Sequence, residues 1–160
     1  MIEDCHVIKV QVDDIGNGTG IRVTVWCAGC SHQCKGCHNP TTWKWKQGTP
    51  LTEALIQKIL KACNREEISG LTLTGGDPLF IKNREGVLAL CKAFRAKFGK
   101  SKTIWMWTGF THNDIKDIEI LQYIDVLIDG KFVQELKDIS LPYSGSSNQR
   151  VIYLKRTNNA

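Results

Sequence analysis

Hydrophobic and polar positions alternate in a short run at residues 21–26, which reads IRVTVW. β-Branched residues in such a run are typical of a strand. The run follows the glycine-rich segment GNGTG at 16–20 and leads directly into a group of cysteines. We therefore expect a strand at 21–26, with the cysteines in the loop at its carboxyl end, where α/β folds place ligands.

Two later segments carry apolar residues at helical spacing. In the first, the repeat begins at Leu55, and Thr49 and Pro50 before it fit a helix cap and first turn. In the second, the repeat occupies residues 87–98, and Gly99 fits the end of a helix. The pattern predicts two amphipathic helices.

Other apolar runs predict further strands, at 68–74, 103–107, 124–128 and 149–154. With a helix expected around 113–122, strands and helices alternate along the chain, which indicates a parallel sheet covered by helices. About four repeats are too few for a closed eight-stranded barrel. We expect an α/β fold, an open, partial (β/α) barrel with a mostly parallel sheet.

We expect residues 1–160 to form one domain, because domains usually hold about 100–200 residues. Within it we expect a cysteine loop at 27–40 and a terminal loop and strand at 140–155.

Net charge and composition exclude few classes of function. The net charge of +5 comes from 21 basic and 16 acidic residues that are scattered along the chain, which favours an ordinary solvated surface over a nucleic-acid site. No apolar run approaches the roughly 18 residues of a membrane span, and the first residues lack the pattern of a secretory signal. We expect a cytoplasmic protein whose partners include neither nucleic acid nor membrane.

The sequence CSHQCKGC places Cys30, Cys34 and Cys37 in one short loop. Soft sulfur ligands at this spacing suit an iron-sulfur cluster or zinc. Three thiolates on a four-iron cube would leave one iron open, and an open iron can bind a substrate. The pattern therefore predicts a 4Fe-4S cluster with three cysteine ligands.

Cys27 leaves a second interpretation open, because it forms a C-x-x-C pair with Cys30 and could add a fourth ligand to a zinc site. Only residues 31–33 separate that pair from the next, which is cramped for zinc knuckles. The alternation of the preceding strand favours Cys27 as a small buried residue beneath the cluster. A thioredoxin-like redox pair is a third reading, and it is less favoured because no helix begins at the pair.

The Cys-x3-Cys-x2-Cys pattern after a first strand resembles the signature of the radical S-adenosylmethionine superfamily. CSHQCKGCHNPTTW at 30–43 is similar to the corresponding segment of anaerobic ribonucleotide reductase activating proteins. The later segments LTLTGGDPL, WMWTGF, LIDGKF and GSSNQ resemble segments of that family in the same order. The resemblance spans nearly the whole chain.

The resemblance implies a radical enzyme of the oxidoreductase class. In that superfamily the open iron chelates S-adenosylmethionine, and one electron from the reduced cluster cleaves it to methionine and a 5′-deoxyadenosyl radical. The implied activity is hydrogen abstraction from a glycine of the large reductase subunit, with reduced flavodoxin or a similar protein as the electron donor. Alternatives are activation of another glycyl radical enzyme such as pyruvate formate-lyase, a small-molecule radical reaction, or a non-catalytic zinc or electron-transfer module.

Several residues outside the cysteines are candidates for binding S-adenosylmethionine. Gly75 and Gly76 end a strand where backbone can approach a ligand closely, and they resemble the superfamily turn that meets the methionine amino group. Asp77 follows them, and it also fits a turn residue before proline. By resemblance, Gly36 and His38, on either side of Cys37, would line the adenine side, although an isolated histidine is more often a solvated loop residue.

Two further groups have open roles. Asn17, Gly18 and Arg22 resemble the opening segment of the family and either shape the cleft or form a tight turn. Trp105 and Trp107 share a strand face and favour core packing. Trp43 and Trp45 are expected to pack over the cysteine loop or to contact the partner protein.

Overall fold

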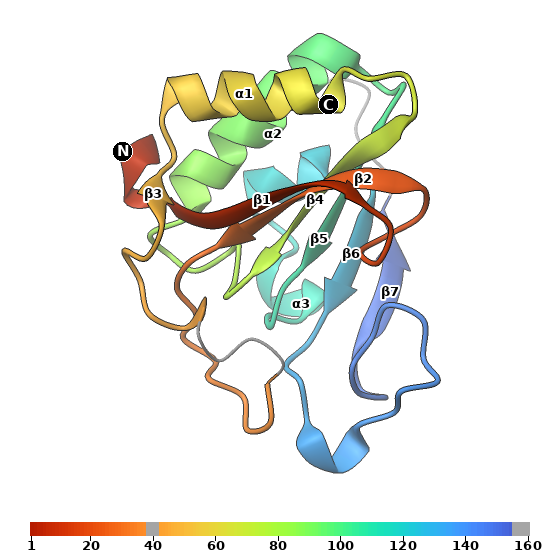
Figure 1. Ribbon diagram of the computed structural model, residues 1–160. Helices are drawn as coiled ribbons and strands as arrows, with labels where there is room; N and C mark the ends of the chain where they lie inside the picture. Colours follow the sequence, from red (N-terminus) through yellow and green to blue (C-terminus); the bar gives the residue numbers. More distant parts are fainter. Residues whose placement is uncertain (38–41, 155–160) are drawn as a thin grey trace.

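The computed structural model describes residues 1–37 and 42–154. Within them, one sheet contains strands in the order β3-β1-β2-β4-β5-β6-β7 (Figure 1). The strands are β1 (His6–Asp14), β2 (Ile21–Cys27), β3 (Thr49–Pro50), β4 (Ile68–Gly75), β5 (Thr103–Trp107), β6 (Val126–Asp129) and β7 (Arg150–Tyr153).

The middle of the sheet is parallel and its margins are antiparallel. β2, β4, β5 and β6 run parallel to their neighbours, whereas β1 and β7 pair antiparallel with β2 and β6. The sheet is open, because β3 and β7 lie at opposite ends of the strand order. The expected open α/β sheet is confirmed, and its parallel character is confined to the four central strands.

The helices are α1 (Glu53–Cys63), α2 (Arg84–Phe98) and the short α3 (His112–Ile115), with 3-10 turns η1 (Ile2–Asp4), η3 (Glu119–Tyr123) and η4 (Gln134–Leu136). Figure 1 shows α1 and α2 together on one side of the sheet, with η4 at the opposite end of the molecule. Apolar residues of α1 and α2 pack with those of the central strands in the main core. Because α1 and α2 lie on one side of the sheet, no long helix among the described residues covers the carboxyl ends of the parallel strands.

Helix boundaries show one wrong prediction. Thr52, not Thr49, caps α1, and its hydroxyl accepts a hydrogen bond from the Leu55 amide at 3.1 Å. Thr49 and Pro50 form β3 instead, because the edge of β1 pairs with them. α2 ends at Gly99 as expected, with a positive φ of 56°.

The helix expected at 113–122 is divided into α3 and η3. Ile115 and Ile120 are both buried, at 2% and 3% exposure. Residues five positions apart do not share one face of a continuous helix. The break between the two pieces lets both isoleucines reach the core.

Arg22 is a fully buried cation in β2, directly after the glycine-rich turn. Its guanidinium donates to the Thr72 hydroxyl at 2.8 Å and to the backbone carbonyls of Thr19, Leu71 and Thr103 at 2.8–3.0 Å. Burial lowers its pKa to about 10. Arg22 therefore ties the turn to the β4 and β5 backbones.

Replacing Arg22 with Met is expected to lower the free energy of unfolding by at least about 3 kcal/mol, because a buried cation is removed from its site and four buried or partly buried oxygens lose their donor. Urea denaturation of the cluster-free protein measures this. The matched control is Arg65→Met. Arg65 pairs with Asp13 and Glu67 at the surface, where solvent screens the interaction, so its replacement should cost much less. Equal losses in both variants would contradict the structural role of Arg22.

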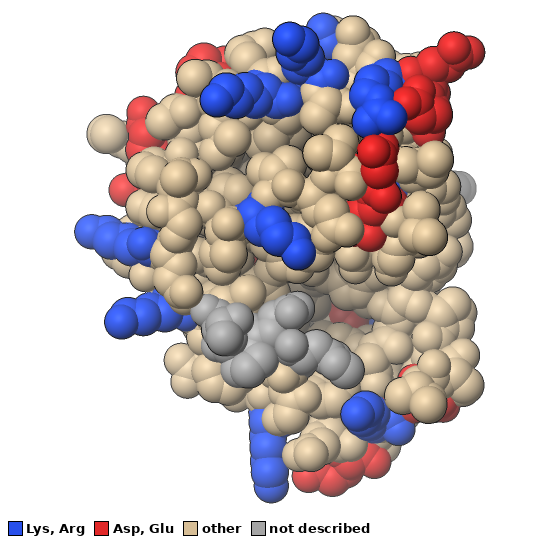
Figure 2. All heavy atoms as spheres, in the orientation of Figure 1, with Lys and Arg blue, Asp and Glu red and all other residues tan. Residues whose placement is uncertain are grey.

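The side of the molecule drawn in Figure 2 is not dominated by one sign of charge. Figure 2 shows acidic and basic side chains interspersed on the visible side, with several lysine and arginine residues far from one another. In the described part of the chain, no helix combines the length and the apolar character needed to cross a membrane.

Candidate functional site

A cavity of about 360 Å³ opens where the parallel strands end. Its walls at the ends of β4 and β5 are formed by Thr74, Gly75, Gly76, Trp107, Thr108 and Gly109. The loop after β2 contributes the three thiols of Cys30, Cys34 and Cys37 to the same cavity. The cysteines predicted as cluster ligands and the predicted glycine turn thus face one space, although their role as ligands stays a prediction.

Backbone amides surround two of the thiols. Backbone N–H groups of His32 and Gln33 favour the thiolate form of Cys30, and that of Phe132 favours the thiolate form of Cys34. Burial nevertheless raises the pKa of both thiols. Binding a metal centre would therefore release protons from these thiols, and the amide donors would then stabilise the thiolates.

The cavity wall also contains a buried hydrogen-bond donor that a bound ligand can satisfy. The indole Nε1 of Trp43 is buried and has no hydrogen-bond acceptor among residues 1–37 and 42–154. Trp43 lines the cavity beside the cysteines. Three thiols, two of them with nearby amide donors, and a buried N–H without an acceptor in the described residues suit an iron-sulfur cluster with a polar ligand beside it.

Close backbone contacts explain the two glycines at the end of β4. Gly75 has a φ of 115°, and a Cβ there would lie 2.5 Å from the Cys27 amide nitrogen. A Cβ at Gly76 would lie 2.5 Å from the Gly29 carbonyl oxygen and 2.6 Å from that of Thr42. Both glycines line the cavity, and both also let the cysteine loop pack directly on the turn.

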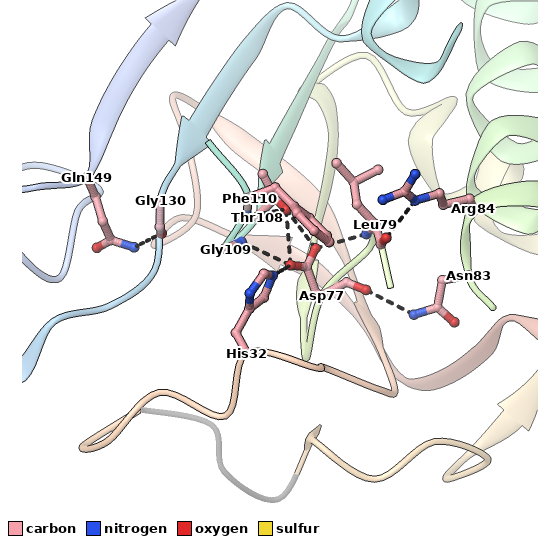
Figure 3. A network of polar contacts seen from close by, with 10 residues as sticks. All are labelled: His32, Asp77, Leu79, Asn83, Arg84, Thr108, Gly109, Phe110, Gly130 and Gln149. Carbon is pink, nitrogen blue, oxygen red and sulfur yellow. Dashed lines mark hydrogen bonds and ion pairs between the residues drawn. The ribbon is translucent and has the colours of Figure 1, made fainter. Parts of the chain in front are cut away.

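Asp77 lies differently from its two neighbours. It is only 1% exposed, and its carboxylate accepts hydrogen bonds from His32, Leu79, Thr108 and Gly109 (Figure 3). These donors come from the protein and occupy both carboxylate oxygens. Its predicted contact with S-adenosylmethionine stays a prediction, and the structure gives it internal partners.

The remaining cysteines occupy the core. Cys27 is 1% exposed, and a hydrogen bond with Cys5, together with burial, raises its pKa well above the usual value. Burial likewise raises the pKa of Cys63 and Cys91 to about 12. The expectation that Cys27 is a small buried residue is confirmed, and Cys63 and Cys91 occupy core positions of α1 and α2.

A compact group of possible ligands for a single ion lies beside the cavity. One ligand atom each of Cys30, His32 and Asp77 lie within 4.8 Å of one another. Two of these residues already bond each other, because His32 Nε2 donates to Asp77 at 2.7 Å. The sequence prediction included Cys30 and Asp77 for different roles and did not bring them together with His32.

The residues that line the cavity include several that sequence reasoning missed. Phe132 and Tyr143 line it, and Tyr143 has a positive φ of 64°. The indole of Trp107 donates to the Tyr143 carbonyl oxygen at 2.7 Å. Gln149 donates to the Gly130 carbonyl at 2.9 Å and accepts from the Gly145 amide. The segments LIDGKF and GSSNQ, which carry Phe132 and Gln149, were the available signal.

The other candidates divide between the cavity and the core. Asn17 lines the cavity and Gly36 faces the Gln134 side chain. Trp105 is buried in the core, as expected. The indole of Trp45 donates to the Asp4 carbonyl oxygen at 2.7 Å, so it packs on the amino-terminal segment. His38 lies outside the described residues.

Comparison with known proteins agrees with this geometry. The family described as "4Fe-4S single cluster domain" matches residues 16–152. Three similar relatives are each named anaerobic ribonucleoside-triphosphate reductase-activating protein. That of Enterobacteria phage T4 is 43% identical over 89% of this chain and 90% of its own length. The Escherichia coli protein is 42% identical over 89% and 94%, and that of Pasteurella multocida is 43% identical over 92% and 96%.

The family model includes the cysteine loop, the glycine turn and the parallel strands, and the three relatives each cover about nine tenths of the chain. The chain belongs to the family of anaerobic ribonucleoside-triphosphate reductase-activating proteins.

Proposed function

We propose that this chain activates an anaerobic ribonucleotide reductase by generating a glycyl radical on its large subunit. One observation carries the proposal: Cys30, Cys34 and Cys37 of a single loop all line one cavity at the carboxyl ends of the parallel strands. Relatives named for activation of such a reductase cover about nine tenths of the chain. The open sheet then corresponds to a partial barrel of the radical S-adenosylmethionine type, formed by one domain.

In this proposal Cys30, Cys34 and Cys37 hold a 4Fe-4S cluster and leave one iron open. When bound, the cluster would supply the one electron that cleaves S-adenosylmethionine, and the carbon radical so formed would remove one hydrogen atom from the glycine. The backbones of Gly75 and Gly76 would border the methionine end, and those of Gly36 and Cys37 the adenine end. His38, also expected at the adenine end, lies outside the described residues. A reduced flavodoxin or similar protein supplies the electron.

The chain's own residues bind, orient and exclude water. The Trp43 indole offers an N–H to a polar group of the ligand, since it has no acceptor within the described segments. Phe132, Trp107 and Tyr143 add three aromatic side chains to the cavity wall. Such a wall limits access of water, which would favour transfer of the radical to the partner over its loss.

The reaction needs no acid or base side chain, because a hydrogen atom moves rather than a proton. This agrees with a cavity whose lining residues include thiols, glycines, hydroxyl groups, amides and aromatic rings, with His32 engaged by Asp77. The chain's contribution is therefore positioning.

Cleavage of S-adenosylmethionine by the chain alone tests the proposal. After anaerobic reconstitution with iron and sulfide and reduction with dithionite, we expect 5′-deoxyadenosine and methionine in equal amounts. A sample without cluster should form neither. No cleavage by a protein with an intact, reduced cluster would overturn the proposal, and zinc in place of iron after purification would favour a structural metal site.

A further inference from the structure

His32 differs from its neighbours in the cysteine loop. Ser31, Gln33 and Lys35 are exposed, whereas the His32 side chain is only 6% exposed. It lies between the first two predicted ligands and points away from solvent toward the interior (Figure 3). A buried imidazole requires a hydrogen-bond partner.

That partner is the carboxylate of Asp77, which joins three segments. His32 Nε2 donates to Oδ2 at 2.7 Å, the Gly109 amide donates to the same oxygen at 2.9 Å, and the Thr108 hydroxyl donates to Oδ1 at 2.8 Å. The amide of Leu79 supplies a further donor at 2.9 Å. A carboxylate with these donors holds the cysteine loop, the turn after β4 and the end of β5 together.

Packing against neighbouring residues also holds the His32 imidazole in place. A Cβ on Gly109 would lie 2.3 Å from the His32 ring, so the glycine lets the ring lie against the backbone. The Phe110 ring meets the imidazole edge to face, with the ring centres 4.6 Å apart. The imidazole therefore occupies a slot at the end of β5.

We propose that His32, held by Asp77, is a positioning residue that fixes the cysteine loop over the strand ends before a cluster binds. The inference rests on the proposed function, because it takes Cys30 and Cys34 as cluster ligands. It gives Asp77 a role through His32 instead of direct contact with S-adenosylmethionine. A loop ordered in advance binds its cluster without the entropy cost of ordering at that moment.

Hydrogen exchange of the cluster-free, full-length protein tests this without relying on catalysis. His32→Phe keeps an aromatic ring in the slot and removes the donor. We expect amides at 31–37 to exchange about tenfold faster or more, since a hydrogen bond to a charged group is lost, while α1 is unchanged. His32→Gln, which retains an N–H donor, should restore part of the protection, and His112→Phe should have no effect.

Cluster assembly provides the second measurement. His32→Phe and Asp77→Asn are expected to incorporate iron and sulfide several-fold more slowly and to change the electron paramagnetic resonance spectrum of the reduced cluster. Unchanged loop exchange in His32→Phe would overturn the inference, even if the wild type cleaves S-adenosylmethionine. Zinc binding that requires His32 and Asp77 but neither Cys34 nor Cys37 would also overturn it, by making the group a single-ion site. If cleavage fails while the loop loosens as expected, the proposed function fails and the positioning role stands.

Discussion

Replacing Cys30, Cys34 or Cys37 with alanine is expected to remove the iron-sulfur cluster and the cleavage of S-adenosylmethionine with it. The three thiols line the same cavity, and each would bind a different iron of the cube. Changes in the second coordination shell already cost about 10–100-fold in metal affinity or activity, so loss of a ligand should cost at least about 100-fold. Iron and sulfide content and 5′-deoxyadenosine formation measure both effects.

Cys27→Ala and Cys63→Ala are the matched controls for these variants. Both residues are buried in the core, and burial keeps both as neutral thiols by raising their pKa. We expect both variants to retain the cluster and the cleavage, with a small loss of stability. Loss of the cluster in Cys27→Ala to the same degree as in Cys30→Ala would show a four-thiol site and contradict the three-ligand assignment.

Replacing Gly76 with alanine adds one methyl group and is expected to lower both the stability of the protein and its iron content. The added Cβ would lie 2.5 Å from the Gly29 carbonyl oxygen and 2.6 Å from that of Thr42. Both atoms belong to backbone that flanks the cysteine loop, so the loop has to move. Overpacking of this kind costs about 1–3 kcal/mol, and the displaced thiols should bind less iron. Urea denaturation and iron content are the measurements.

Gly16→Ala separates this effect from the general consequence of replacing a glycine. Gly16 lies in the turn after β1, and a Cβ there would have its nearest neighbour 3.6 Å away, at an Asp14 carboxylate oxygen. We expect that variant to keep its cluster and its stability within about 0.5 kcal/mol. A Gly76→Ala protein as stable and as rich in iron as Gly16→Ala would show that the close approach at Gly76 is unimportant.

Local patterns in the sequence predicted much of the sheet and its helices. The alternation in IRVTVW gave β2 within one residue, and Gly99 gave the end of α2. β1 was missed even though Val10 and Val12 alternate with polar Gln11. β3 could not be found locally, because two residues become a strand only through pairing with β1. The antiparallel direction of β7 likewise depends on where the chain returns.

The sequence predicted that the three cysteines lie together at one site, but not which residues support their loop. The spacing of the cysteines indicated a metal centre because all three lie in one loop. The bond between His32 and Asp77 joins residues 45 positions apart, and Thr108 is a further 31 positions from Asp77. No spacing rule connects such residues, so only the fold brings them together. The Tyr143 wall was missed for the same reason.

The central claim is that this chain places a radical on a glycine of the reductase. Electron paramagnetic resonance of the large reductase subunit, incubated anaerobically with the cluster-loaded chain, dithionite and S-adenosylmethionine, tests it most directly. We predict a glycyl radical doublet that needs all three additions, accompanies formation of 5′-deoxyadenosine and is absent with Cys34→Ala. A chain that cleaves S-adenosylmethionine and binds the large subunit, yet leaves no radical on it, would contradict the claim.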